Sequence, residues 1–251
     1  MTVHTYTKVN IGLHVLRRRP DGYHDLETLF VPYYGVGDDL TVDLSTTLAI
    51  AVSGADWDPW DDLTIQAWRL LKRDYPELAP VKIMLQKHVP VGAGLGGGSA
   101  DGAEALRCIN ELARLGLGLE QLASYASRLG SDCAFFLHRR PMLGTGRGEV
   151  LTPFEIDLSA WDLRVEVPEG VAVNTREAYS GIVPRDDRPP LAELLKAPVE
   201  QWRDLIVNDF EASVCQRYPQ ITALKERMYA DGAIYAAMSG SGSAVFGLFP
   251  K

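Results

Sequence analysis

The pattern with the clearest chemistry is the glycine-rich stretch from Pro90 to Ala100, in which five of eleven residues are glycine. Glycine loses more backbone entropy on folding than other residues do. This density therefore indicates a backbone conformation, or a close approach to the backbone, that a Cβ atom would block. The economical explanation is an anion held by backbone N–H groups, as in other glycine-rich loops that bind phosphate.

The elements on either side of the stretch suit this interpretation. An alternating strand is expected over residues 81–89, and a helix from Asp101 to Leu115. Apolar residues recur at helical spacing in the helix, namely Ala103, Leu106, Ile109, Leu112 and Ala113, and the same spacing directs Glu104, Arg107 and Glu111 outward. The loop would deliver its ligand to a helix N-terminus, where unpaired N–H groups and the helix dipole favour a phosphate.

Other interpretations of the loop are weaker. Gly92, Gly94 and Gly97 form a G-x-G-x-x-G pattern, but no N-terminal βαβ unit with an acidic residue closing a second strand accompanies it, as a dinucleotide site requires. The stretch is not a Walker A sequence, because it lacks Gly-Lys-Ser/Thr. A flexible linker is disfavoured because a strand and a helix flank the stretch.

The rest of the chain alternates strands, turns and helices. Strands are expected over residues 6–15, 26–31, 40–44, 48–52, 163–167, 233–238 and 244–249, with 40–44 and 48–52 in a meander; helices are expected over 63–71, 119–129, 192–196, 199–207 and 221–229. Lys8 and Asn10 share the polar face of the first strand. The pattern restarts near residue 157, which predicts a first domain over 1–157 and a second over 158–251.

The glycine-rich stretch resembles the phosphate-binding motif of the GHMP kinase superfamily. Four further segments resemble the family within it that acts on 4-diphosphocytidyl-2-C-methyl-D-erythritol: Lys8-Val-Asn-Ile-Gly-Leu, residues 19–30 with Asp-Gly-Tyr-His, residues 129–136 with Gly-Ser-Asp-Cys, and Gly240-Ser-Gly-Ser-Ala244. The resemblance implies an α+β, two-lobed GHMP kinase fold. Its N-terminal lobe, similar to a domain of a ribosomal protein, would bind ATP, and its C-terminal lobe would bind the substrate.

The resemblance also implies catalytic roles. Asp132 matches the general base, and Lys8 matches its electrostatic partner, which also favours the ionised carboxylate. The pair would direct the 2-hydroxyl of the methylerythritol moiety onto the γ-phosphorus of ATP. The positions implied for ATP, with Mg²⁺ as its metal, are Leu63, Pro90, Val91, Gly92, Ala93, Gly94, Leu95, Gly96, Gly97, Gly98, Ser99 and Ala100. Ser99 is the expected side-chain contact.

The acceptor is implied by a second group of residues. In the resembled family, the positions of Tyr23 and His24 recognise a cytosine ring, Tyr by stacking and His by hydrogen bonding to the base edge. Stacking with edge recognition is the usual way to bind an unpaired base. Asn10, Thr175 and Tyr179 also match substrate-contacting positions. The implied partner is a small molecule linked to cytidine diphosphate.

Three features depart from the family pattern. Asp62 replaces an Asn beside the adenine, and a carboxylate cannot supply the amide donor. Asp101 and Glu104 are expected in the first turn of the helix after the loop. Negative charge there suits the dipole but opposes a nucleotide phosphate unless Mg²⁺ lies between them. Ala244 to Lys251 stands where some relatives carry a longer end with a further helix.

Composition narrows the class of protein. The 251 residues, with 46% hydrophobic and 23% charged content, are ordinary for a globular enzyme, and the net charge of −8 disfavours a broad nucleic-acid surface. Cys108, Cys133 and Cys215 form no C-x-x-C pair, which favours reduced thiols in the core.

No apolar run reaches the roughly 18 residues of a membrane span, and Met1 to Asn10 lacks a signal-peptide core. A cytoplasmic location is expected, without nucleic-acid or membrane partners; the oligomeric state and the metal ligands are open.

Two other functions stay open at this point. A GHMP kinase for homoserine or mevalonate would keep the loop and the fold but would lack a nucleobase-reading pair such as Tyr23 and His24. A nucleotide or metabolite sensor on the same fold would be expected to lose the catalytic pair, Lys8 and Asp132.

Overall fold

The computed structural model describes residues 1–251, and the chain forms two compact units built from separate stretches. Unit 1 contains residues 1–7, 36–91 and 96–139, and unit 2 contains residues 8–35, 92–95 and 140–251. The glycine-rich stretch contributes to both, with Gly92 to Leu95 in unit 2 and its two ends in unit 1. The sequence predicted a boundary at residue 157 between an ATP-binding lobe and a substrate-binding lobe. This division depends on where ligands bind, so it stays a prediction.

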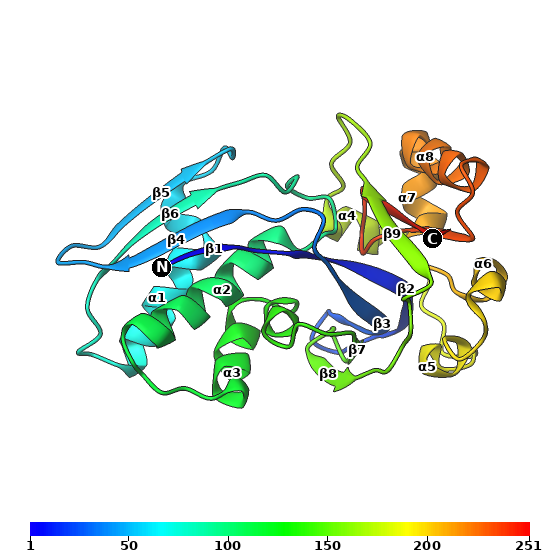
Figure 1. Cartoon of the computed structure of the whole chain (residues 1–251). Helices are drawn as coiled ribbons and strands as arrows, with labels where there is room; N and C mark the ends of the chain where they lie inside the picture. Colours follow the sequence, from blue (N-terminus) through cyan, green and yellow to red (C-terminus); the bar gives the residue numbers. More distant parts are fainter. The chain divides into compact units, whose positions relative to one another are not determined.

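Unit 1 is a mixed sheet with helices against one face (Figure 1). The sheet order is β1 (Thr2–His4), β4 (Asp39–Leu44), β6 (Val81–Gln86) and β5 (Ala49–Ser53); the helices are α1 (Leu63–Asp74), α2 (Gly97–Leu112) and α3 (Leu119–Leu129), with short 3₁₀ turns η1 (Pro59–Asp61) and η2 (Cys133–Leu137). In β6, buried Val81, Ile83 and Leu85 alternate with exposed Lys82, Met84 and Gln86, so one face of the strand packs against the core.

The expected meander of β4 and β5 was wrong. β6 lies between them, pairing antiparallel with β4 and parallel with β5. A parallel pair needs a long crossover connection, and α1 supplies it between β5 and β6. Local alternation identifies the strands but carries no information about which strand lies beside which.

Unit 2 contains two antiparallel sheets. The first has the order β2 (Thr7–Arg18), β3 (His24–Tyr33), β7 (Met142–Thr145) and β8 (Val150–Pro153), and the second has the order β10 (Tyr235–Met238), β11 (Val245–Pro250) and β9 (Trp161–Glu166). The helical segments are α4 (Thr175–Ser180), α5 (Leu191–Leu194), η3 (Val199–Gln201), α6 (Trp202–Leu205), α7 (Glu211–Arg217) and α8 (Pro219–Ala230). α4 and α7 were not anticipated, because each spans only about two turns and shows little periodicity.

The helix predictions differ in accuracy for a physical reason. α3 has the expected bounds, and its C-cap is Gly130, whose N–H donates to Ala126 O. α2 instead begins four residues before the expected start. Gly96 adopts a left-handed conformation at φ 74° as its N-cap, so Gly97 to Ala100 form the first turn rather than a loop. Their glycine content, which signals a loop, concealed the helix.

No helix is both long and apolar enough to cross a membrane. The three cysteines are free thiols; Cys108 and Cys133 are buried, as expected for core residues, and Cys215 is half-buried.

Buried His14 makes the stability of the protein sensitive to acid. Neither ring nitrogen has a hydrogen-bond partner, and burial, with a contribution from the Arg188 cation, lowers the pKa of His14 to about 4. The unfolded chain therefore binds this proton at higher pH than the folded chain does, so stability falls as the pH drops from 6.5 toward 4.

We expect His14→Leu to remove this loss. As the pH is lowered from 7 to 5, the free energy of unfolding of the wild type should fall by about 2 kcal/mol more than that of the variant, as measured by urea denaturation. The comparison between the two chains cancels all other titrating groups. Parallel pH profiles for the variant and the wild type would contradict the assignment.

Candidate active site

In unit 1, the end of the glycine-rich stretch is the N-terminal turn of α2. The Ala100 N–H donates to Gly96 O, so the N–H groups of Gly97, Gly98 and Ser99 precede the first intrahelical bond. Gly98 is exposed, and an added Cβ there would meet nothing within 4 Å. The expected phosphate site at a helix N-terminus thus has the required donors, and phosphate binding itself stays a prediction.

The two acidic residues of α2 do not oppose a phosphate in the way the sequence suggested. Asp101 and Glu104 are both buried and lie beyond the first turn. Asp101 accepts a hydrogen bond from Lys87 Nζ at 2.6 Å, and Glu104 accepts from Arg107 and Arg139, each at 2.6 Å. The expectation that Glu104 points outward was wrong, because Arg139, remote in sequence, supplies the cation that permits burial. Burial raises the pKa of Asp101 to about 7, and the Lys87 charge opposes this shift.

Asp62 is the N-cap of α1. Its Oδ1 accepts hydrogen bonds from Thr64 N at 2.9 Å and from Thr64 Oγ1 at 2.6 Å. An Asp caps a helix as well as an Asn does, which gives the carboxylate a structural role of its own. Leu63, at the position implied near adenine, packs against α2. Its Cβ lies 3.0 Å from the place that a Cβ added at Gly102 would occupy.

Asp132 immediately precedes η2 (Cys133–Leu137). It is the N-cap position of the 3₁₀ turn, and its side chain does not cap it. The neighbouring Cys133 is fully buried, and its thiol makes a side-chain hydrogen bond with Ser99 in the first turn of α2. Burial raises the pKa of Cys133 to about 12, so this residue remains a neutral thiol. Within unit 1, the predicted base is therefore adjacent in sequence to a residue that touches the predicted phosphate site.

In unit 2, Lys8 and Asn10 lie beside the middle of the glycine-rich stretch. Lys8 Nζ donates to Asn10 Oδ1 at 2.5 Å and to Gly94 O at 2.9 Å, and the Lys8 N–H donates to Leu95 O at 3.0 Å. Asn10 Nδ2 donates to Thr28 Oγ1 at 2.9 Å. Both side chains are buried rather than solvated, so the charge of Lys8 is held in a fixed place.

The loop between β10 and β11 completes this arrangement. Ser239 Oγ donates to Gly94 O at 3.0 Å and accepts from the Asn10 N–H at 3.3 Å. Buried Asn208 donates from Nδ2 to Met238 O and Gly240 O, each at 2.8 Å. The Ser-Gly motif at residues 240–244 was recognised in the sequence, but Ser239 and Asn208 were not. A buried polar residue outside any motif leaves no local signal.

The residues implied for cytosine recognition gather elsewhere in unit 2. The rings of His24 and Tyr179 stack with centroids 4.9 Å apart at an interplanar angle of 16°. Burial lowers the pKa of His24, and the Arg18 charge adds to this effect, so the imidazole is neutral. Tyr23 is 56% exposed, and the Arg147 guanidinium lies 4.8 Å from its ring centroid.

Thr175 belongs to the same short helix as Tyr179. Its hydroxyl lies 3.1 Å from Ser241 Oγ, in the β10–β11 loop. Asn174 caps this helix by accepting from the N–H groups of Arg176 and Glu177. The matched segment from residue 174 to residue 179 is thus a capped helical turn, which fixes the positions of both candidate side chains.

No group of three or more His, Cys, Asp or Glu side chains is arranged to hold a metal ion. Asp101 and Glu104 already pair with cationic side chains.

Two family models match parts of this chain. Residues 62–140 match the model for the GHMP kinases N terminal domain, and residues 191–251 match that for GHMP kinases C terminal. The chain is 43% identical over 247 residues, 97% of its length and 91% of the relative's, to a protein of Azobacteroides pseudotrichonymphae named 4-diphosphocytidyl-2-C-methyl-D-erythritol kinase. A protein of Bacteroides fragilis with the same name is 44% identical over 96% of this chain and 89% of its own.

A solved structure is similar over nearly the whole chain. The crystal structure of a 4-(cytidine 5'-diphospho)-2C-methyl-D-erythritol kinase superposes with a TM-score of 0.82 at 34% identity, covering 99% of this chain and 90% of the other. The expected two-lobed GHMP kinase fold is confirmed by this match together with the two family models.

Proposed function

The chain belongs to the GHMP kinase family, and from this premise we propose that it transfers the γ-phosphoryl group of ATP to the 2-hydroxyl of 4-diphosphocytidyl-2-C-methyl-D-erythritol. The products are ADP and the 2-phosphate of the acceptor, and the reaction belongs to the non-mevalonate route to isoprenoid precursors. The observation that carries the proposal is the similarity, at 43% identity over 97% of the chain, to a relative named for this acceptor. This similarity also supports a small-molecule substrate and, as part of the proposal, a cytoplasmic location.

The ATP part of the proposal depends on the glycine-rich stretch. Gly97, Gly98 and Ser99 present backbone N–H groups at a helix N-terminus, where the dipole stabilises phosphate charge. Mg²⁺, when bound with the nucleotide, would neutralise phosphate charge, and Ser99 is the side chain of the stretch that would contact the phosphate or the metal. Leu63 contributes apolar contact for the adenine in this arrangement.

The proposed chemistry uses one carboxylate and one ammonium group. Asp132 accepts the proton of the 2-hydroxyl and orients its oxygen toward the γ-phosphorus. Lys8 supplies positive charge at a place fixed by Asn10 and Gly94, which stabilises the developing charge on the transferred group. Catalysis then comes mainly from positioning and charge neutralisation, as in other phosphoryl transfers.

The acceptor would be held by its cytidine end. Tyr23 offers an exposed ring for stacking, and neutral His24 can donate at one ring nitrogen and accept at the other, which suits the edge of cytosine. Tyr179 stacks on His24, and Thr175 lies on the same helix, so both are placed with this pair. Asn10 completes the proposed acceptor contacts.

A coupled ADP-release assay tests the function. The cytidine diphosphate acceptor should turn over, whereas homoserine and mevalonate should not. Turnover of only a non-nucleotide alcohol would refute the proposal in favour of another GHMP kinase. Tight ATP binding without turnover of any acceptor would favour a sensor.

We expect His24→Ala to act mainly on acceptor binding. Loss of a base-edge hydrogen bond and of the stacked pair with Tyr179 should raise KM for the cytidylyl substrate about tenfold with little change in kcat, because this binding is the same in the ground and transition states. Exposed His4 is a matched control, and His4→Ala should behave as wild type. An unchanged KM in His24→Ala would move cytosine recognition elsewhere.

A further inference from the structure

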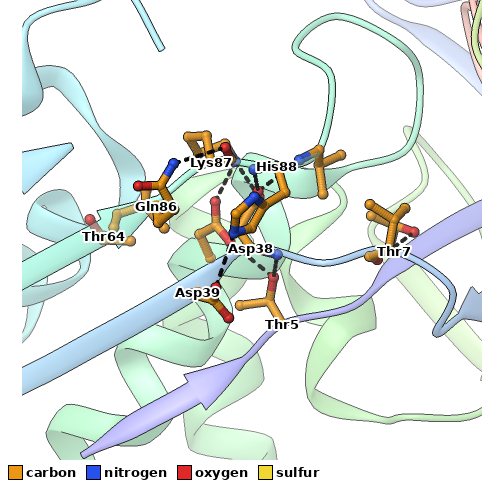
Figure 2. Close-up of polar contacts among 12 residues, drawn as sticks. Thr5, Thr7, Asp38, Asp39, Thr64, Gln86, Lys87 and His88 are labelled. Carbon is orange, nitrogen blue, oxygen red and sulfur yellow. Dashed lines mark hydrogen bonds and ion pairs between the residues drawn. The ribbon is translucent and has the colours of Figure 1, made fainter. Parts of the chain in front are cut away.

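A buried ionic network in unit 1 lies directly behind the glycine-rich stretch. Lys87 Nζ donates to Asp38 Oδ2 at 2.5 Å and to Asp101 Oδ2 at 2.6 Å. The three side chains are at most 3% exposed. Figure 2 shows Lys87 and Asp38 pointing toward one another, with Thr5 and His88 beside them. Three charges are thus removed from water in one place.

The remaining hydrogen-bonding capacity of the network is also used. Asp38 Oδ1 accepts from the N–H groups of His88 at 2.5 Å and Val89 at 2.8 Å. Thr5 Oγ1 donates to Asp101 Oδ1 at 3.2 Å and accepts from the Asp38 N–H at 2.9 Å (Figure 2). A buried charge cluster is tolerated when its geometry is good and its lone pairs are satisfied, as they are here.

The members of the network bracket the phosphate-binding stretch in sequence. Lys87 to Val89 immediately precede Pro90, and Asp101 immediately follows Ala100. A Cβ added at Gly97 would lie 3.3 Å from Asp38 Oδ2 and 2.9 Å from the Val89 side chain, so the first turn of α2 packs directly on this cluster. The network therefore joins the segment that enters the stretch to the helix that leaves it.

Stability alone does not account for such a cluster. Replacing a buried charge triad with apolar residues is often neutral or stabilising, because desolvation offsets the Coulomb attraction. Short, directional hydrogen bonds instead hold the side chains of the network in a single geometry. The Lys87 ammonium already has both carboxylates as partners and is buried, which leaves it unsuited to contact a nucleotide directly.

We propose that Lys87 is a positioning residue for ATP, holding the N-terminal turn of α2 in register with the end of β6 by bridging Asp38 and Asp101. Through this bridge the N–H groups of Gly97 to Ser99 are presented to the phosphates in one fixed orientation. The inference builds on the proposed function, and its test reads ATP binding separately from acceptor turnover.

The first test is Lys87→Met, with Lys82→Met as the matched control. Lys82 lies on β6, the strand that immediately precedes Lys87, and is exposed. Because displacement of a positioning element by about 1 Å can cost about 100-fold, kcat/KM for ATP should fall about 10- to 100-fold in Lys87→Met. KM for the acceptor should stay within about twofold of wild type. Lys82→Met should match the wild type in both quantities.

Loss of Lys87 leaves two buried carboxylates without a cation, which can unfold the chain. A second variant, Lys87→Met with Asp38→Asn and Asp101→Asn, removes all three charges of the network and keeps the shapes of the two acidic side chains. It should fold, as judged by circular dichroism, and still bind ATP weakly. The Ala100 amide, which donates to Gly96 O in the first turn of α2, should exchange hydrogen faster than in the wild type.

Calorimetry with a non-hydrolysable ATP analogue separates this inference from the proposed function. Wild-type affinity for the analogue in the charge-free variant, with unchanged amide exchange, would overturn the role of Lys87 and leave the kinase assignment intact. Failure of the wild type to phosphorylate the cytidylyl acceptor would instead refute the function, while the analogue affinities would still decide the role of Lys87.

Discussion

Replacing Asp132 with Asn is expected to lower kcat by about 10²- to 10⁴-fold, the range typical for loss of a general base. Asn has nearly the same shape but cannot accept the proton of the attacking hydroxyl. The side chain does not cap η2, so the 3₁₀ turn does not need the carboxylate as a cap. ATP affinity should be nearly unchanged, because the proposed phosphate contacts come from the N-terminal turn of α2 instead.

The effect of Asp132→Asn is best tested by measuring turnover and ATP binding separately. Single-turnover kinetics give the chemical step, and calorimetry with an ATP analogue gives the affinity. Asp74→Asn is a matched control, because Asp74 is a partly exposed carboxylate at the end of α1 that contacts Tyr125 and Arg128. Wild-type turnover in Asp132→Asn would remove this residue from the role of base. A large loss of ATP affinity would point to a binding role.

The locally encoded parts of the fold were predictable from the sequence. β2 and β11 follow runs of alternating or apolar residues, and α3 has both a helical stripe and a terminal Gly130. Such signals arise from neighbours within a few residues. They fail where pairing is remote, as in the insertion of β6 between β4 and β5.

The same distinction applies to the candidate site. The glycine-rich stretch and the Asp-Gly-Tyr-His segment were recognisable because each is a continuous motif. The stacking of His24 on Tyr179 and the donation of Lys8 to Gly94 O depend on the tertiary fold. A motif resemblance could suggest that these residues share a site, but it could not identify the atoms through which they contact one another.

Buried polar residues outside the motifs were the least predictable. Lys87 and Asp38 read as ordinary charged residues next to strands, and Glu104 falls on the side of α2 that its spacing assigns to solvent. Their burial depends on partners far away in the chain, such as Arg139 for Glu104. Since a charge is buried only when it is paired, such positions become recognisable only once the partner is located.

Gly94 is a position at which a single added methyl group should be strongly destabilising. Its φ of +77° is in the left-handed region, and an added Cβ would overlap the backbone carbonyl oxygen of Ser239 and lie 3.1 Å from Gly242 N and O. The obstacle is backbone, so no side chain can rotate away. The Gly94 carbonyl also accepts from Lys8 and Ser239, so any shift of the loop moves both donors.

Gly94→Ala is therefore expected to lower stability and catalysis together. The left-handed conformation alone costs a non-glycine residue about 1–2 kcal/mol, and displacing the β10–β11 loop adds to this. Because Lys8 moves with the loop, kcat/KM for ATP should also fall by about 100-fold. Denaturant unfolding and steady-state kinetics on the same preparation measure the two effects.

Gly116 provides the control that separates strain from collision. It has a similar φ of +70°, but an added Cβ there meets nothing within 4 Å. Gly116→Ala should thus show the cost of conformation, about 1–2 kcal/mol, with wild-type kinetics. If Gly94→Ala instead lost no more stability than Gly116→Ala and kept its activity, the prediction would be contradicted. That result would show that the loop can move and that contact between Gly94 and Ser239 does not hold Lys8 in place.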